Sequence, residues 1–565
     1  MKEVVAKVVM KALKEKGIEI SKKEVIDLIE IPPNPEFGDY AFPCFAFSEK
    51  LKDNSSQIAI EIRQKIGNFP ETDFEDIQTE GPYINFFVNR KSLARQIVWD
   101  AIMKKKDYGK IKPKKKKKTM VEFCSPNTNK PLHLGHLRNM AIGESISRIL
   151  EFCGEKVIRA NLDNDRGIHI CKSMLAYKKW GKEKTPDDKK IKPDHFVGHF
   201  YTLFNKKKTK KLEKEAQEML KKWEDGDKET LMIWRLMNNW ALKGFKETYK
   251  KFGIKHDVDF FESKIYGKGK EIILEGVDKG LFEKTKKGEV KINLEDEGLG
   301  EKILLRSDGT SLYITQDIAL AKLKFDKYDL DKSLYVTGNE QEYHFKVLFS
   351  VLEKMGFDKE MANISYGMVN LPSGKMKSRE GTVVDADDLI EKIRVMAEKE
   401  ISKREKISKS ELKKRSLIVA LAAIKYMLLK VDINKNILFN PKESVSFEGD
   451  TGPYILYSYA RASSIMKNAP KEKKFEVPEL EDKEVELIKK LSFFPEVVLN
   501  ASKNLNPALI ANYSFQLAQT FNEFYHMCRV IGSDEESFRL TLVESFRQVL
   551  KNSLNLLGIE VLEEM

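Results

Sequence analysis

A short apolar strand, a long amphipathic helix and a second strand follow one another in the first third of the chain. Thr119 to Phe123 has the length and character of a buried strand, and apolar residues recur at helical spacing from about Leu134 to Phe152. The run 156–161 is again strand-like. Strand, helix, strand in this order is the unit of parallel nucleotide-binding sheets. The sequence therefore predicts an α/β catalytic domain with a Rossmann-type parallel sheet.

The rest of the chain divides by composition and pattern. At 565 residues the chain is too long for one compact core, so several domains are expected. Five consecutive lysines, Lys114 to Lys118, mark an exposed linker that precedes the predicted sheet. Strand signals largely vanish beyond the catalytic domain. The expected parts are a small α+β N-terminal domain at 1–110, a basic linker at 111–118, the catalytic domain at 119–385 with an insertion at about 178–305, a helical segment at 386–440 and an all-helical domain at 441–565.

The composition limits the cellular setting and the partners. The chain has 100 Lys plus Arg against 87 Asp plus Glu, a net charge of +13, which suits a phosphate-rich partner such as RNA but equally suits a lysine-rich genome. Its five cysteines are scattered and form no C-x-x-C pair, so neither a disulfide framework nor a zinc site is predicted. The most apolar helical run, Leu417 to Leu429, is too short to cross a bilayer. We therefore expect a cytoplasmic protein without a membrane segment or a structural metal.

The first chemical motif lies between the first strand and its helix. The loop Ser125–His136 ends in His-Leu-Gly-His, where two histidines flank a glycine that lets a ligand approach the backbone closely. A helix N-terminus presents free N–H groups and the positive end of a dipole, both of which suit phosphate. Four residues of this kind arise easily by chance, but their place at a strand-to-helix junction strengthens the prediction of an ATP site.

The second motif is a basic loop far downstream. Gly374 and Gly381 bracket Lys375, Lys377 and Arg379. Cations on such a loop can close over a triphosphate and neutralise the charge that develops at the α-phosphate and pyrophosphate. In a lysine-rich protein a solvated basic turn would be the default interpretation, and only the first motif favours the functional one.

Together the two motifs resemble the HIGH and KMSKS signatures of class I aminoacyl-tRNA synthetases, in the right order. Five further blocks are similar to arginyl-tRNA synthetases in particular, and they run from one end of the chain to the other. These blocks are 37–40, 125–139, 308–319, 338–345 and 452–457. The resemblance implies an enzyme that uses ATP to adenylate arginine and then transfers the arginine to the 3′-terminal adenosine of tRNA(Arg), releasing AMP and pyrophosphate.

The resemblance also assigns roles to residues. ATP, taken as its Mg²⁺ complex, would bind the first motif and the basic loop, and His133, His136, Lys130 and Lys375 would stabilise the transferring phosphoryl group. The ATP-contacting residues would be His133, Gly135, His136, Lys375, Met376 and Lys377. Asn127 and Lys130 would hold the amino and carboxylate groups of arginine. Because a guanidinium is a planar fork of donors, its pocket needs acceptors. Those matched to the family are Glu262, Tyr313, Asp317 and Gln341.

Transfer RNA would contact the two ends of the chain. The N-terminal domain resembles the module that binds the outer corner of tRNA, with Asn85 and Phe87 as candidates. The segment 386–440 would contact the stem, and the C-terminal domain would read the anticodon through stacking residues, of which about half are expected to face the core instead. Those candidates are Tyr454, Tyr457, Tyr459 and Arg461. Another aromatic and aliphatic set, Phe515, Leu517, Phe521 and Phe524, is predicted to be bundle core.

Two positions depart from the family pattern. Ser378 stands where the basic signature usually has lysine, and Gln316 stands where arginine is common, so no role is transferred to Gln316. We expect Lys130 to supply part of the missing charge. The Lys130→Ala variant should then slow adenylate formation by about tenfold or more, with a smaller effect on ATP affinity. An unchanged rate of pyrophosphate exchange would contradict this.

Three other classes of protein share some of these sequence features. Another class I synthetase would share both motifs, although one for cysteine should carry clustered zinc-ligand cysteines. A small nucleotidyltransferase also uses the His-x-Gly-His turn but needs no helical C-terminal domain. A non-catalytic RNA-binding relative would have lost His133, His136 or Lys375, and all three are present. We expect arginine, ATP and tRNA(Arg) as partners of a chain that works as a monomer.

Overall fold

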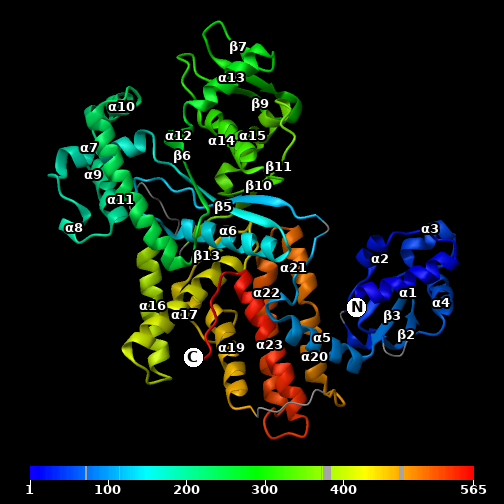
Figure 1. Ribbon diagram of the computed structural model, residues 1–565. Helices are drawn as coiled ribbons and strands as arrows, with labels where there is room; N and C mark the ends of the chain where they lie inside the picture. Colours follow the sequence, from blue (N-terminus) through cyan, green and yellow to red (C-terminus); the bar gives the residue numbers. More distant parts are fainter. Residues whose placement is uncertain (33, 70–72, 114, 371, 373–383, 470–475) are drawn as a thin grey trace. The chain divides into compact units, whose positions relative to one another are not determined.

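The computed structural model describes residues 1–32, 34–69, 73–113, 115–370, 372, 384–469 and 476–565 (Figure 1). The chain forms two compact units, each assembled from separate stretches of sequence. The first contains Met1–Tyr108, Ile465–Phe493 and Gln519–Val549, and the second contains Gly109–Ser464, Phe494–Ala518 and Leu550–Met565. The C-terminal helical region thus contributes to both units.

The first unit is built around a small antiparallel sheet. Its strands are β1 (Tyr40–Pro43), β2 (Phe74–Glu80) and β3 (Tyr83–Val88), in the order β1-β3-β2. The helices of its N-terminal part are α1 (Lys2–Glu15), α2 (Lys22–Leu28), α3 (Ser48–Leu51), α4 (Ser55–Ile66) and α5 (Arg90–Lys104). Phe42, Phe74 and Phe86, one from each strand, are fully buried and form the apolar face of the sheet. This mixture confirms the predicted α+β N-terminal domain.

A five-stranded parallel sheet forms the centre of the second unit. Its strands lie in the order β11-β10-β4-β5-β6, and every neighbouring pair is parallel. They are β4 (Lys118–Glu122), β5 (Lys156–Asp163), β6 (Val258–Phe261), β10 (Lys332–Gly338) and β11 (Glu360–Tyr366). The predicted Rossmann-type sheet is confirmed. Strand β6 falls inside the range 178–305 that the sequence assigns to an insertion, so part of that range completes the sheet.

Helices cover both faces of this sheet. Helix α6 (Leu134–Phe152) lies on one side, and α14 (Tyr313–Tyr328) and α15 (Glu342–Lys354) lie on the other (Figure 1). Met120, Ala160 and Phe260, from three adjacent strands, pack against Ala319 and Leu320 of α14 in one apolar cluster. Neighbouring residues of a central strand, such as Met120 and Val121 of β4, are both fully buried, as expected where both faces of a sheet are covered.

The lysine-rich insertion is helical, as its pattern predicts, and carries a small second sheet. Helix α7 (Ile168–Trp180) leads into the insertion. Its own helices are α8 (Pro186–Lys189), α9 (Pro193–Lys206), α10 (Lys210–Glu224), α11 (Lys228–Phe252), α12 (Glu262–Ile265) and α13 (Lys268–Asp278). The antiparallel sheet that follows has the order β7-β8-β9, with β7 (Glu283–Lys284), β8 (Val290–Leu294) and β9 (Gly300–Leu305).

The remainder of the chain is helical, which confirms the prediction for the C-terminal domain. Its helices are α16 (Ala386–Ser402), α17 (Lys409–Leu429), α18 (Pro441–Ser444), α19 (Gly452–Lys467), α20 (Asp482–Ser492), α21 (Phe494–Lys503), α22 (Ala508–Met527) and α23 (Glu536–Leu556). One two-residue pair, β12 (Val369–Asn370) with β13 (Ile437–Leu438), interrupts them. Leu517, Phe521 and Phe524 are fully buried, as expected of core, and Phe515 is half-buried. Among the helices of the described residues, none is both long and apolar enough to span a membrane.

Candidate active site

The turn between β4 and α6 has an unusual backbone that asparagine side chains hold in place. Cys124 and Ser125 both have positive φ values, +80° and +47°, which non-glycine residues rarely adopt and which cluster at functional sites. The Cys124 N–H donates to Asn139 Oδ1 at 2.5 Å, and the Ser125 N–H donates to Asn161 Oδ1 at 3.1 Å. Asn164 Nδ2 donates to the Ser125 carbonyl at 3.0 Å. The first motif therefore starts from a fixed point at the carboxyl end of the sheet.

Both histidines of the first motif have a defined tautomer. The His133 N–H donates to His136 Nδ1 at 3.0 Å, and the Gly135 N–H donates to His133 Nδ1 at 3.2 Å. Since each Nδ1 accepts a hydrogen bond, each Nε2 carries the proton and is the donor left for a ligand. Burial lowers the pKa of His133 to about 3 and holds the pKa of His136 well below its usual range, with Lys130 adding to both effects. The imidazoles are thus neutral donors at pH 7, and their ring centroids lie 3.8 Å apart.

Lys130 lies beside these rings and lines a cavity. The cavity has a volume of about 250 Å³, and its other walls include His133, His195, His199 and Asp385. Burial lowers the pKa of the Lys130 ammonium. Two imidazole donors and a poorly solvated ammonium together can stabilise a phosphate, because charges interact more strongly where water is excluded.

Asn127, the other residue predicted to hold the α-amino and carboxylate groups, lies at the start of the same loop. It pairs in parallel with Asn164, which follows β5, and the neighbouring Thr128 N–H donates to the Asn164 carbonyl at 3.2 Å. The loop is therefore tied to the ends of both β4 and β5, where ligands of parallel sheets bind.

Two of the predicted arginine-binding residues lie on one face of α14. Tyr313 begins the helix and is 70% exposed, and Asp317 follows one turn later. The Asp317 carboxylate accepts, at its Oδ2, a 2.6 Å hydrogen bond from Nε2 of His344 on α15. Sequence reasoning missed His344, although it stands three residues after Gln341 in one of the family-like blocks. Helix α15 therefore supports the carboxylate that α14 presents.

Glu262 is buried where β6 meets α12. Burial raises its pKa to about 7; the neighbouring Arg166 guanidinium acts in the opposite direction, and the carboxylates of Asp165 and Asp317 add to the rise. Glu262 and Asp317 therefore act on each other electrostatically although they come from different elements. Two acidic groups of this kind favour a cation between them, because its charge offsets their mutual repulsion.

Arg166 is a second residue that the sequence did not reveal. Its guanidinium lies 3.2 Å from the centroid of the Tyr266 ring and 5.4 Å from that of Trp223, and it forms an ion pair with Glu224. Arg166 directly follows the polar run 163–165 at the carboxyl end of β5. Polar residues at that edge of a parallel sheet were the available signal, since ligands bind there.

The remaining predicted residues have varied surroundings. Gln341 is exposed immediately before α15, and Lys375, Met376 and Lys377 lie outside the described residues. Among the tRNA candidates, Asn85 is buried within β3 and Phe87 is half-buried.

The C-terminal candidates divide in the same way. Tyr454, Tyr457 and Arg461 are half-buried on α19, and Arg461 lies over the Tyr457 ring at 5.0 Å. Tyr459 is buried, and its hydroxyl donates to Glu563 Oε1 at 3.1 Å. One of the four, Tyr459, therefore belongs to the core, and the other three are partly accessible.

Asp194, His195 and Asp387 offer ligand atoms within 4.8 Å of one another, a spacing that a metal ion could use. The Lys192 ammonium, however, already bonds to Asp194 and Asp387 at 3.1 and 2.8 Å. The positive charge between the two carboxylates is therefore the Lys192 side chain itself. The five cysteines are free and buried at separate places.

Models of three protein families match three successive parts of this chain. The model for tRNA synthetases class I (R), catalytic domain, matches residues 97–440, that for the DALR anticodon binding domain matches 455–565, and that for the arginyl tRNA synthetase N terminal domain matches 2–88. The chain is 45% identical to the arginine–tRNA ligase of Treponema denticola over 563 residues, which covers 95% of this chain and 94% of that protein. It is 46% identical to that of Parabacteroides distasonis over 480 residues, or 79% and 80% of the two chains.

Solved structures agree with this result. The arginyl-tRNA synthetase of Thermus thermophilus superposes with a TM-score of 0.85 at 25% identity and covers all of both chains. That of Plasmodium falciparum has the same fold, with a TM-score of 0.80 at 22% identity, and covers 100% of this chain and 99% of that one. The catalytic-domain match alone spans more than half of the sequence. The chain therefore belongs to the arginyl-tRNA synthetase family of class I aminoacyl-tRNA synthetases.

Proposed function

We propose that this chain is an arginine–tRNA ligase whose reaction takes place at the carboxyl end of the parallel sheet. In the first step a carboxylate oxygen of arginine attacks the α-phosphorus of ATP, the bond to the bridging oxygen breaks, and pyrophosphate leaves. In the second step a hydroxyl of the 3′-terminal adenosine of tRNA(Arg) attacks the carbonyl carbon of the adenylate, and AMP leaves. Neither step needs a covalent enzyme intermediate, so the protein supplies alignment and charge stabilisation.

The first motif is the proposed ATP site. The two neutral imidazoles would each direct an Nε2–H toward the triphosphate of MgATP, and Lys130 would add a positive charge. Gly135, at the start of α6, lets the nucleotide approach the helix N-terminus. Lys375, Met376 and Lys377 of the second motif would contact the same substrate, with Mg²⁺ arriving as part of it.

The pair of acidic side chains, Glu262 and Asp317, is the observation that supports arginine as the substrate. The charge of Asp317 acts on the buried Glu262, and Tyr313 lies one turn from Asp317 on the same helix. A guanidinium would satisfy both acids with its planar fork of donors, whereas the compact ammonium of lysine could not. Citrulline would leave a carboxylate without a counter-charge. Asn127, Lys130 and Gln341 would complete the arginine site.

Arginine binding should depend on pH through Glu262. Its pKa of about 7 means that the carboxyl is partly protonated at neutral pH, and only the ionised form pairs with a guanidinium. The KM for arginine should therefore rise as the pH falls through 7, by about tenfold between pH 8 and pH 6 for a single proton. The Glu262→Gln variant should show a high KM that no longer changes over this range. A flat KM in the wild type would contradict this role.

The direct test is charging of total tRNA with each of the twenty labelled amino acids, in the presence of ATP and magnesium. Product with arginine alone is the expected result. Product with a different amino acid would keep the class I chemistry and overturn the proposed pocket. No product with any of them would favour an RNA-binding relative without catalytic activity.

Two further properties complete the proposal. A single chain contributes all the residues of the proposed arginine site, so a monomer suffices, and sedimentation of the free protein would test this. Five free cysteines suit the reducing cytoplasm, where disulfides are rare. The half-buried Tyr454, Tyr457 and Arg461 are kept as anticodon-side candidates, and the half-buried Phe87 as the candidate in the N-terminal domain, where Asn85 is buried.

A further inference from the structure

A short backbone bridge connects the first motif to the segment that leads into α16. His133 and Asp385 pair in antiparallel fashion. The Leu134 N–H donates to the Val384 carbonyl at 3.0 Å, and the Ala386 N–H donates to the Leu132 carbonyl at 3.0 Å. Any displacement of residues 384–386 would therefore move the backbone that carries His133 into α6.

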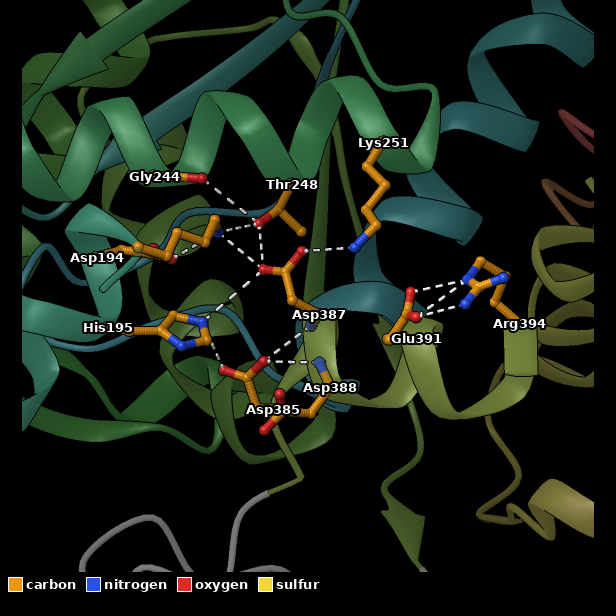
Figure 2. Close-up of polar contacts among 11 residues, drawn as sticks. Asp194, His195, Gly244, Thr248, Lys251, Asp385, Asp387, Asp388, Glu391 and Arg394 are labelled. Carbon is orange, nitrogen blue, oxygen red and sulfur yellow. Dashed lines mark hydrogen bonds and ion pairs between the residues drawn. The ribbon is translucent and has the colours of Figure 1, made fainter. Parts of the chain in front are cut away.

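The insertion holds this segment through Asp387. Lys192, just before α9, donates from its Nζ to Asp387 Oδ2 at 2.8 Å. Thr248 of α11 donates to the same oxygen at 2.8 Å (Figure 2). Lys192 also bonds to Thr248 Oγ1 at 2.6 Å, so three elements meet at one ammonium. Lys251, one turn beyond Thr248, lies 3.5 Å from the other carboxylate oxygen. The pKa of Asp387 is lowered by these partners, although burial opposes them.

A second contact holds the same segment through Asp385. Its Oδ1 accepts the N–H groups of Asp387 and Asp388 at 2.9 and 3.1 Å and so caps α16. Its Oδ2 lies 3.2 Å from His195 Nε2 on α9 (Figure 2). This close contact with the Asp385 carboxylate is the main reason why the pKa of His195 is raised. The Asp194 carboxylate also raises it, whereas burial and the Lys192 charge act in the opposite direction.

The packing around these groups leaves little freedom. Asp194 is completely buried, and a Cβ on Gly244 of α11 would overlap its carboxylate. Desolvating charges is unfavourable, and well-packed apolar residues usually stabilise a core as well or better. What an ion-pair network adds is a defined geometry. A role in positioning therefore accounts for this cluster better than a contribution to stability alone.

We propose that Asp385 and Asp387 are positioning residues for adenylate formation: Lys192 and His195 clamp the two carboxylates, and the backbone bridge to residues 132–134 carries that fixed geometry to His133 and His136. Neither carboxylate needs to touch ATP or arginine for this. The inference rests on the proposed function, because it concerns the placement of the two imidazoles against ATP.

The test uses the full-length protein with MgATP, arginine and tRNA. The measured quantity is the single-turnover rate constant of arginine-dependent pyrophosphate release with enzyme in excess, which does not depend on the fraction of active protein. The Asp387→Asn variant keeps the shape of the side chain and leaves Lys192 to neutralise Asp194. Its rate constant is expected to fall by about tenfold or more, since misplacement of reacting groups by 1 Å can cost about 100-fold. The KM for arginine should stay within about twofold, because the pocket on α14 is untouched.

Asp388→Asn is the matched control. It removes the same charge at the next position of α16, where the side chain is exposed, and it keeps the N–H that Asp385 caps. This variant should retain the wild-type rate. A second pair of variants, His195→Ala and His195→Gln, tests the other clamp, because only glutamine can still donate to Asp385. The alanine variant should be slow, and the glutamine variant should recover most of the rate.

The outcomes separate the inference from the proposed function. Equal rate constants for Asp387→Asn and Asp388→Asn, in a wild type that is active with arginine, would overturn the inference alone. If Asp387→Asn does not fold, as judged by circular dichroism, the His195 pair decides: equal rates for alanine and glutamine would overturn it. A wild type without arginine-dependent pyrophosphate release would overturn both.

Discussion

Replacing Asp317 by asparagine should reduce kcat/KM for arginine in tRNA charging by about 100- to 1,000-fold, because the guanidinium would lose a charged partner. The carboxylate is about 28% exposed and is fixed by its 2.6 Å hydrogen bond to His344. The amide keeps the shape of the side chain and one acceptor oxygen, so the effect isolates the charge. The same variant should discriminate less against citrulline, whose urea group no longer leaves a carboxylate unpaired.

Asp326→Asn is the control for this experiment, since Asp326 is exposed on the same helix and should give wild-type kinetics. A rival explanation is that Asp317 serves only to hold His344. In that case His344→Ala would lower kcat/KM for arginine as much as Asp317→Asn does. The double variant would then be no worse than either single one. Our interpretation expects the asparagine variant to be clearly the more damaging of the two.

The strands and helix that build the ATP side of the site could be predicted because their signals are local. The apolar run before Cys124 and the periodicity from Leu134 to Phe152 correspond to β4 and α6, and the helix agrees residue for residue. A strand-to-helix turn with two histidines can be recognised within a dozen residues of sequence. Tyr313 and Asp317 are assigned by the resemblance of the block 308–319 to arginyl-tRNA synthetases, and α14 places them one turn apart on a common face.

The partners of these residues could not be predicted, because they meet only after the chain has folded. His344 is 27 residues from Asp317 and lies on another helix, and Lys192 is 195 residues from Asp387. In a chain with 100 basic residues, nothing local distinguishes Lys192 from a solvated lysine. Alternation in a strand likewise does not tell which face is covered, so Asn85 could be proposed as a surface residue although it is buried.

Arg138, two residues after His136, is a third residue whose role depends on distant partners. Its side chain is fully buried. The guanidinium donates to the carbonyls of Met368, Ile433 and Lys435 at 3.4, 3.1 and 2.9 Å, and also to that of Gly367. Burial lowers its pKa to about 10, which still leaves it charged at neutral pH. One side chain of α6 thus satisfies four backbone acceptors from two separate segments.

The Arg138→Met variant should be strongly destabilised, by about 3–5 kcal/mol, because methionine fills the space but takes the donor from the carbonyls of Gly367 and Lys435. The carbonyls of Ile433 and Met368 would keep the backbone N–H groups that they also accept. A chain of two units does not unfold in one step, so the quantity to measure is the first thermal transition. That transition should move down by about 5–10 °C. Arg235→Met, at an exposed position of α11, should shift it by no more than about 1 °C and serves as the control. Equal shifts for the two variants would mean that water replaces the guanidinium without loss, and that this arginine does not hold α6 against the 367–368 and 433–435 segments.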